Sequence, residues 1–191
     1  MAEKILYFGY GANRDPKMME WITGNPNLKA RPGVLKGYNL CVQRLDQVPD
    51  TVAETAPVPS TPRKILEDNW PSTFTSYIIR EDPEGEVTGT IWELTPQERE
   101  LVRDWELIDF GWYRDLRVKV ITEDGQELEV QTEGLRDGQK FEKEVDGTNY
   151  ETWLNPPLEF KKIATKSREE YTQRLQSQEG STISGEVKEL S

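Results

Sequence analysis

The stretch Lys4–Arg14, KILYFGYGANR, decides how the rest of the chain is read. A short apolar run, Ile5–Phe8, predicts a first β-strand. It leads into Gly9–Asn13, where two glycines flank a tyrosine, so the backbone can turn sharply and expose its N–H groups. Such a row of N–H groups can hold an anion or a developing oxyanion, although a plain strand ending in a glycine-rich turn has the same pattern.

The composition favours one polar globular domain. The chain has 191 residues, a formal net charge of −11, 31% charged residues and 35% hydrophobic residues. This length allows one domain with a sizeable core and is short for two. Because an acidic chain repels phosphate groups, we expect no binding to nucleic acid or to a membrane surface. No apolar run reaches about 18 residues and no signal-peptide pattern opens the chain, so we expect a cytoplasmic protein.

Two scarce residue types limit the possible chemistry. The chain contains no histidine and a single cysteine, Cys41. These counts argue against Ser-His-Asp and Cys-His triads, against zinc sites and against an intramolecular disulfide. Cys41 lies in an apolar stretch and is expected to be a small buried core residue. No nucleotide-binding glycine motif is present, so we expect no cofactor, and any acid–base group should be a carboxylate, lysine or tyrosine.

The order of the expected elements indicates an α+β fold in which strands outnumber long helices. One helix should begin after Asp15 and end at 25–27, and Thr95–Glu98 predicts the capped start of a second that runs to about Glu106. Strands are expected at 34–45, 74–80, 87–94, 113–122 and 128–132, with a hairpin turn at Asp124-Gly125. The rhythm of a doubly wound fold is missing, so a small barrel-like mixed sheet with a few flanking helices fits best.

Other segments are expected to be irregular. Residues 46–72 carry five prolines and few large apolar side chains, which predicts a long loop that is either a lid over a site or a simple excursion. Asp82–Gly85 predicts a turn. Towards the C-terminus, we expect one helix at about 158–164 and another that begins at Ser167. The predicted division is a domain at 1–176 and a polar, disordered tail at 177–191.

Three stretches resemble the gamma-glutamylcyclotransferase-like family, and together they span about three quarters of the chain. YFGYGAN, at 7–13, resembles the YFAYGSN-type signature that opens these proteins. Val87–Val120 resembles a strand with glycine that leads to a helix ending in LDxxEG, followed by a tyrosine and another strand. NYETWLNPPLEFKKI, at 149–163, resembles the family segment NYE…PSPxYKKI, and EEYTQRL at 169–175 resembles the residues that come after that segment in the family.

The resemblance implies the family's fold and its reaction on a small γ-glutamyl substrate, without metal or cofactor. In that reaction the free α-amine of a γ-glutamyl group attacks its own γ-carbonyl, which releases 5-oxoproline and an amine or amino acid. Glu106 matches the family's catalytic glutamate. It lies at the border of the apolar face of its predicted helix, where desolvation would raise its pKa. The implied substrate-binding residues are Tyr7, Phe8, Gly9, Tyr10, Gly11, Ala12 and Phe160.

Departures from the family pattern leave alternatives open. Ala12 stands where the family has serine, and Phe160 stands where it has tyrosine, so two hydroxyl groups are lost. Tyr150 and Tyr171 are candidates to restore one. Around Glu106 the leading Leu-Asp and the trailing Gly of the motif do not match, and a solvated helix-end glutamate is the alternative for this residue. The chain could therefore be a weak or inactive module that binds a γ-glutamyl or amino-acid-like ligand, or an interaction protein with an acidic surface. The sequence predicts no oligomeric state.

Overall fold

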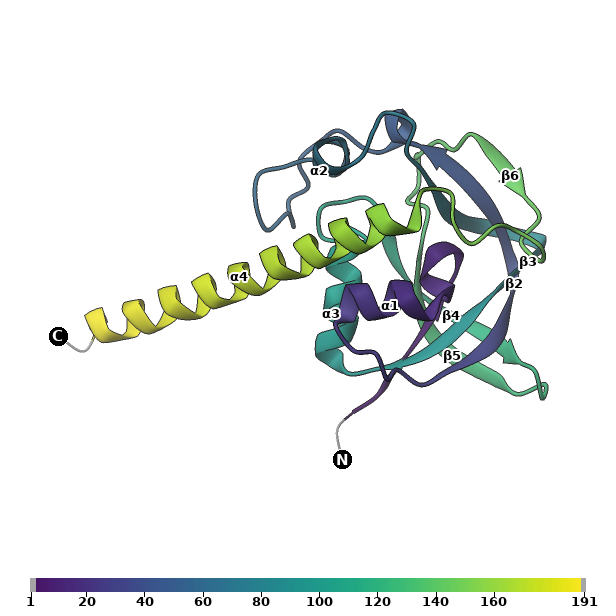
Figure 1. Cartoon of the computed structure of the whole chain (residues 1–191), viewed down its shortest axis with the longest axis horizontal. Coiled ribbons are helices and arrows are strands. Elements are labelled where there is room, and N and C mark those ends of the chain that lie inside the picture. Colours follow the sequence, from purple (N-terminus) through teal and green to yellow (C-terminus); the bar gives the residue numbers. More distant parts are fainter. Residues whose placement is uncertain (1–2, 190–191) are drawn as a thin grey trace.

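The computed structural model describes residues 3–189, which form a closed β-barrel with helices gathered on one side (Figure 1). The barrel strands follow the order β3-β1-β5-β4-β2, and a pairing of β2 with β3 closes the ring. β6 adds an extra strand to β2. β1 runs parallel to β5 and the other pairs are antiparallel, so the predicted α+β fold with a barrel-like mixed sheet is confirmed. The strands are β1 (Ile5–Gly9), β2 (Ala30–Arg44), β3 (Thr75–Leu94), β4 (Arg114–Thr122), β5 (Glu127–Gly134) and β6 (Lys143–Val145).

The predicted first strand and glycine-rich turn are both present. β1 lies between β3 and β5, and its side chains Tyr7 and Phe8 are fully buried. A 3₁₀ helix, η1 (Gly11–Arg14), follows it directly. A Cβ atom on Gly9 would overlap the carbonyl oxygen of Asn13, so only glycine allows the chain to fold back so closely. This turn brings Asn13 back beside the end of β1.

Two helix starts form as their capping residues predict. In α1 (Pro16–Thr23), the Asp15 side chain accepts a hydrogen bond from the Lys17 N–H at 2.8 Å. In α3 (Pro96–Trp105), Thr95 and Glu98 form a capping box. α1 ends at Gly24, which adopts the left-handed conformation at φ 77° and stops the helix just before the predicted break. Because α3 ends at Trp105, Glu106 becomes its C-cap residue.

The two strands predicted at 74–80 and 87–94 form one strand, β3, of 20 residues. Its pairing with β2 is interrupted at Asp82–Gly85: Glu81 pairs with Tyr38 and Glu86 with Lys36, so these four residues have no pairing partner on β2. Opposite them, Gly37 has φ 87°. Asp82 Oδ1 accepts a hydrogen bond of 2.9 Å from the Glu84 N–H, which is the local bonding that the predicted turn requires.

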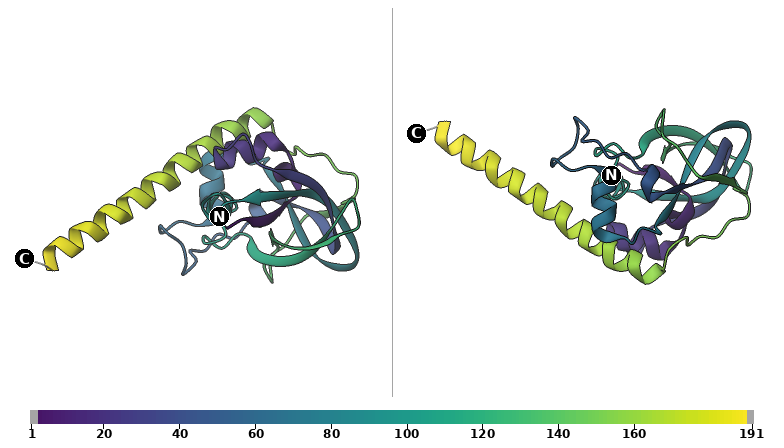
Figure 2. Two further views of the ribbon diagram at one scale, coloured as in Figure 1. Left: turned by 90° about the horizontal axis from the view of Figure 1, so that it is seen from below. Right: turned by 90° about the horizontal axis from the view of Figure 1, so that it is seen from above.

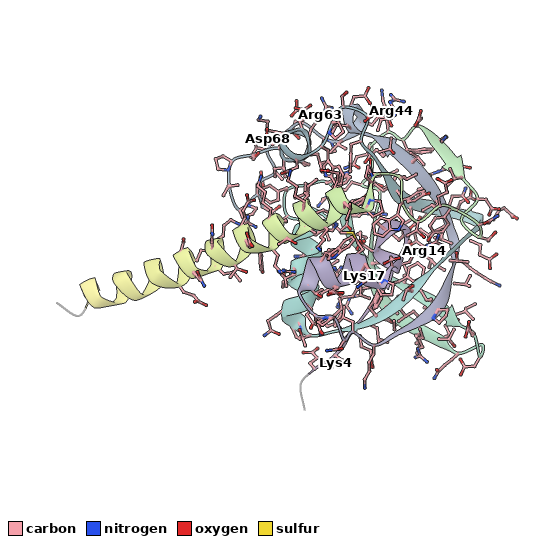
Figure 3. The ribbon with its side chains drawn as sticks, in the orientation of Figure 1. Lys4, Arg14, Lys17, Arg44, Arg63 and Asp68 are labelled. Carbon is pink, nitrogen blue, oxygen red and sulfur yellow. The ribbon has the colours of Figure 1, made fainter. Side chains whose placement is uncertain are left out.

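The predicted long loop at 46–72 is wrong in part. It contains the short 3₁₀ helix η2 (Leu45–Gln47) and α2 (Pro62–Asn69), whose start is capped by Thr61. Val48, Leu66 and Trp70 are buried, so the segment packs onto the domain. Arg63 and Asp68 mark α2 in Figure 3, on the opposite side of the C-terminal helix from Lys17 of α1.

The C-terminal segment forms one helix, α4 (Pro157–Glu189), in place of the two predicted. No proline or glycine interrupts 158–179, so nothing breaks the helix at Ser167. Phe160, Ile163 and Ala164 in its first turns are buried against the domain. The helix continues past residue 177, where the sequence predicts a disordered tail, and its second half projects away from the barrel (Figure 2). The division into a domain at 1–176 and a tail stays a prediction.

The core has two parts. One fills the barrel, with Phe8, Leu35 and Val120 among its members, and the other lies between the barrel and the helices. Cys41 belongs to the second part and is fully buried, as expected for a small core residue. Within residues 3–189, none of the helices combines the length and the apolar character that crossing a membrane requires.

Candidate active site

A cavity of about 100 Å³ lies where η1, α2, the end of α3 and the first turns of α4 meet. Part of its lining comes from α2, so the segment 46–72 contributes to the site wall. Two carboxylates, Glu106 and Glu133, also line the cavity. Eight of the described lining residues are aromatic: Tyr10, Trp70, Phe74, Tyr77, Trp105, Trp112, Tyr113 and Phe160.

Glu106 is fixed by the way in which α3 ends. Its backbone N–H still donates to the carbonyl of Val102, at 2.9 Å. The next residue, Leu107, has φ 52°, so the chain leaves the helix through a sharp turn. The side chain is 8% exposed, and its Oε1 accepts a hydrogen bond of 2.6 Å from Asn13 Nδ2. This burial contradicts the alternative of a solvated helix-end glutamate, whereas a catalytic role stays a proposal.

The surroundings of Glu106 favour its protonated form. Burial raises the pKa of Glu106 well above its ordinary value, and the negative charge of Glu133 raises it further. The hydrogen bond from Asn13 and the positive charge of Arg99 oppose this and lower the pKa. A carboxylate with a raised pKa is a stronger proton acceptor, so it can exchange a proton with an amine more readily than an ordinary glutamate.

Glu133, near the end of β5, is a second buried carboxylate that the sequence did not indicate. It is 2% exposed, and its Oε1 accepts a hydrogen bond of 2.5 Å from the Tyr7 hydroxyl. Burial raises the pKa of Glu133 to about 7, although Arg99 and the bond from Tyr7 lower it. The alternation of Leu128, Val130 and Thr132 as core residues would place Glu133 on the outer face of β5. Tyr7 and Arg99 cover that face here, so Glu133 is buried although the alternation of the strand predicts that it is exposed.

Asn13 joins the two carboxylates into one hydrogen-bonded group. Its Nδ2 donates to Glu106 Oε1 and, at 3.0 Å, to the hydroxyl oxygen of Tyr7, which in turn donates to Glu133. Trp92 Nε1 donates to the Asn13 carbonyl at 2.9 Å and fixes the backbone there. Asn13 is 4% exposed. It ends the signature stretch, yet it was not among the predicted site residues, because nothing local to it shows where its amide points.

The structure divides the predicted substrate-binding residues into two groups. Tyr7, Phe8 and Gly9 do not line the cavity: Tyr7 lies behind it, bonded to Glu133, and Phe8 packs inside the barrel. Gly9 has no Cβ atom and so allows the backbone of Asn13 to lie close to it. The residues that do line the cavity, besides Glu106, are Tyr10, Gly11, Ala12 and Phe160.

The predicted replacements for the lost hydroxyls are not at the cavity. Neither Tyr150 nor Tyr171 belongs to its lining. The Tyr150 hydroxyl donates to the Thr88 carbonyl at 2.6 Å and accepts from the Gly11 N–H at 3.2 Å. One of the backbone donors expected to hold an anion is therefore already engaged.

Two other hydroxyls line the cavity instead. The Ser76 and Tyr113 oxygens lie 2.7 Å apart, and Tyr113 donates to the Tyr77 carbonyl at 2.6 Å. Ser76 lies in β3 and Tyr113 directly precedes β4, and neither was among the predicted site residues.

Phe160 completes an aromatic wall. Its ring centroid lies 4.8 Å from that of Trp70 in an edge-on arrangement, and 5.4 Å from that of Trp153. Trp105, next to Glu106, lies 6.4 Å away. Such ring pairs stabilise the fold beyond the area they bury. Phenylalanine at this position therefore suits an apolar wall of the cavity.

Comparisons with known proteins identify the fold. No protein-family model matches the chain, and no curated protein matches its sequence. A solved structure described as gamma-glutamyl cyclotransferase is 19% identical, with a TM-score of 0.55 and a match over 93% of this chain and 86% of that one. An uncharacterized protein from Homo sapiens is 21% identical, with a TM-score of 0.52 over 73% of this chain and 70% of that one. The chain has the gamma-glutamylcyclotransferase-like fold, as its three sequence stretches predicted.

Proposed function

We propose that this protein is a gamma-glutamylcyclotransferase that acts on a small γ-glutamyl substrate in the cytoplasm. The observation that carries the proposal is the buried Glu106, held by Asn13 at the cavity of a gamma-glutamylcyclotransferase-like fold. Its burial and its neighbour Glu133 raise its pKa, which suits a group that must accept a proton and return it.

The proposed reaction needs one proton carrier. The α-ammonium group of the substrate gives a proton to Glu106, and the free amine then attacks the γ-carbonyl carbon. A C–N bond forms and closes a five-membered ring, and Glu106 passes the first proton to the leaving nitrogen as the bond from that nitrogen to the γ-carbon breaks. The ring nitrogen then gives its second proton to Glu106, which passes it to the released amine. The products are 5-oxoproline and a free amine or amino acid. Because the nucleophile is tethered, positioning supplies much of the rate, with effective molarities of about 10⁵ M or more.

A second candidate is a module of the same fold that binds such a ligand without turning it over. Ala12 and Phe160 both line the cavity and both lack the hydroxyl that the family pattern has. Neither Tyr150 nor Tyr171 replaces those groups at the cavity. A binding module would need the same cavity and the same buried carboxylates, so only a measurement of turnover separates the two candidates.

The test is 5-oxoproline release from a panel of γ-glutamyl dipeptides and γ-glutamyl amines. Glu106→Gln keeps the shape of the side chain and removes its proton-accepting charge, so we expect release to vanish. The matched control is Glu100→Gln on the same helix, where the carboxylate is half exposed and should leave release unchanged. Full turnover by Glu106→Gln would contradict the proposal. Binding of panel members by the wild type without release would favour the module.

A further inference from the structure

Glu133 lines the cavity, and one of its two carboxylate oxygens has no hydrogen-bond partner among the described residues. Its Oε1 is taken by the Tyr7 hydroxyl, but Oε2 is buried and has no hydrogen-bond partner within the described part of the chain. Glu133 itself is 2% exposed and belongs to the cavity lining. Buried polar atoms are nearly always paired, so an orphaned carboxylate oxygen beside a cavity indicates a group that a ligand completes.

No lysine or arginine side chain that the structure describes forms an ion pair with Glu133, although Arg99 is near enough for its positive charge to lower the pKa of Glu133. Arg99 is the nearest buried guanidinium, and its Nε and Nη2 are bonded to Gln131 and Asp115 at 2.9 and 3.2 Å. No ion pair within 4 Å joins Arg99 to Glu133 in the described residues. Lys166 is the one cation in the described cavity lining, and its half-exposed ammonium group lies beside Asn69 and Glu170. Both carboxylates thus feel the positive charge of Arg99, whose Nη1 also has no hydrogen-bond partner, but no described cation forms an ion pair with either of them.

The complementary ligand group is a primary ammonium. An ammonium group has three N–H donors and one positive charge, so it can serve more than one carboxylate oxygen at once. Glu106 and Glu133 reach the same cavity from α3 and β5 and are held together through Asn13 and Tyr7. The side chains that fix them are themselves buried, so the two carboxylates need little rearrangement to receive such a group.

We propose that Glu133 binds the ammonium group of the ligand through its Oε2, beside Glu106. This inference rests on the proposed function for the identity of the ligand and deepens it by assigning a second carboxylate to the same site. Glu106 accepts the proton from the ammonium group, while Glu133 holds that nitrogen in place. The aromatic wall formed by Trp70, Trp105 and Phe160 receives the rest of the ligand.

The test uses two unreactive probes of the same shape, n-butylamine and 1-butanol. Trp70, Trp105 and Trp112 line the cavity, so intrinsic tryptophan fluorescence reports binding without any turnover. At neutral pH the amine is charged and the alcohol is not. We expect the wild type to prefer the amine, and Glu133→Gln to bind the amine about tenfold or more weakly while binding the alcohol equally well. Glu129→Gln, on the same strand but exposed, is the control and should behave as the wild type.

The outcomes separate a ligand-binding role from a structural one. Glutamine can still accept the Tyr7 hydroxyl, so we expect the thermal midpoint of Glu133→Gln to be no lower than that of the wild type. Equal amine binding by the wild type and Glu133→Gln overturns the proposal, and so does a wild type with no preference for the amine. Loss of both probes together with a lowered midpoint also overturns it, because the role is then structural. Amine-selective binding without 5-oxoproline release from any panel member contradicts the proposed enzymatic function but supports the role of Glu133 in binding the ammonium group.

Discussion

The end of α3 and the end of β5 each bring one glutamate to the same cavity, but they hold it differently. Glu106 follows the last turn of a helix, and its Oε1 is held by the amide of Asn13. Glu133 lies in a strand, and its Oε1 is held by the hydroxyl of Tyr7 while its Oε2 has no partner among the described residues. Two buried carboxylates in such different surroundings can have different roles: Glu106 can exchange a proton, and Glu133 can bind a positive charge.

The largest expected effect concerns the free energy of unfolding of the Glu133→Gln variant. The folded-state pKa of Glu133, about 7, lies above its ordinary value, so this group contributes stability below about pH 4.5 that is lost as the pH rises through 7. Glutamine does not titrate, so the variant escapes this loss. We expect the variant to gain on the order of 3 kcal/mol over the wild type between pH 5 and pH 8, measured by urea unfolding at both pH values. A constant difference would show that the pKa of Glu133 is not raised.

The second prediction removes the bridge between the two carboxylates. Asn13→Ala deletes the amide that bonds Glu106 and the Tyr7 oxygen. The hydrogen bond from Asn13 lowers the pKa of Glu106, so its loss should move the acidic limb of the kcat/KM profile to higher pH. We expect kcat to fall by about 10²-fold, because Glu106 also loses its fixed position. An unchanged pH profile with reduced kcat would mean that Asn13 does not act through Glu106.

The third prediction removes the hydroxyl group that supports Glu133 and that also accepts a hydrogen bond from Asn13. Tyr7→Phe keeps the packing of a fully buried ring but removes the donor to Glu133 Oε1. A buried carboxylate that loses its hydrogen bond costs about 1–3 kcal/mol of folding free energy, measurable by urea unfolding. Tyr113→Phe is a matched comparison, because its hydroxyl donates to the neutral carbonyl of Tyr77 and its loss should cost less. Equal costs for the two variants would show that the charge of Glu133 adds nothing to the contact with Tyr7.

The smallest effect is expected at Phe160. Phe160→Tyr restores the family's hydroxyl in a wall formed by Trp70, Trp105 and Trp153. We expect kcat/KM for the best substrate to change by less than about tenfold, because the surrounding side chains are aromatic and the proposed proton carrier is Glu106. Steady-state kinetics of 5-oxoproline release measure this change. A larger gain would show that Phe160 limits activity and would favour the view of the natural chain as a weak enzyme.

Local patterns predicted those parts of the fold whose cause is local. The caps of α1 and α3 and the turn after β1 follow from residues close together in the sequence. The sequence did not show that the strands on either side of Asp82–Gly85 form one strand, because both pair with β2, which is a contact between distant residues. α2 was missed because the prolines around it resemble those of a loop, although Pro62 stands at its first turn.

The site was predictable to the same extent. The position of Glu106 at the end of a capped amphipathic helix could be read from the sequence, and its burial followed. Glu133 could not, because β5 shows the alternation of an ordinary strand and its covered face depends on where Tyr7 and Arg99 come to lie. The amide of Asn13 donates a hydrogen bond to Glu106, and the two residues are 93 positions apart in the sequence. This contact is therefore visible only in the folded structure.

The most direct test of Glu106 as the proton carrier is a pH profile. The rate of 5-oxoproline release from the best substrate of the panel is measured between pH 5 and pH 9. We expect a wild-type profile whose acidic limb lies well above the ordinary pKa of glutamate. We also expect that Glu106→Gln, folded as judged by an unchanged or higher thermal midpoint, loses at least about 10²-fold at every pH. A folded Glu106→Gln variant with the wild-type rate and the wild-type profile would show that the proton is carried by another group.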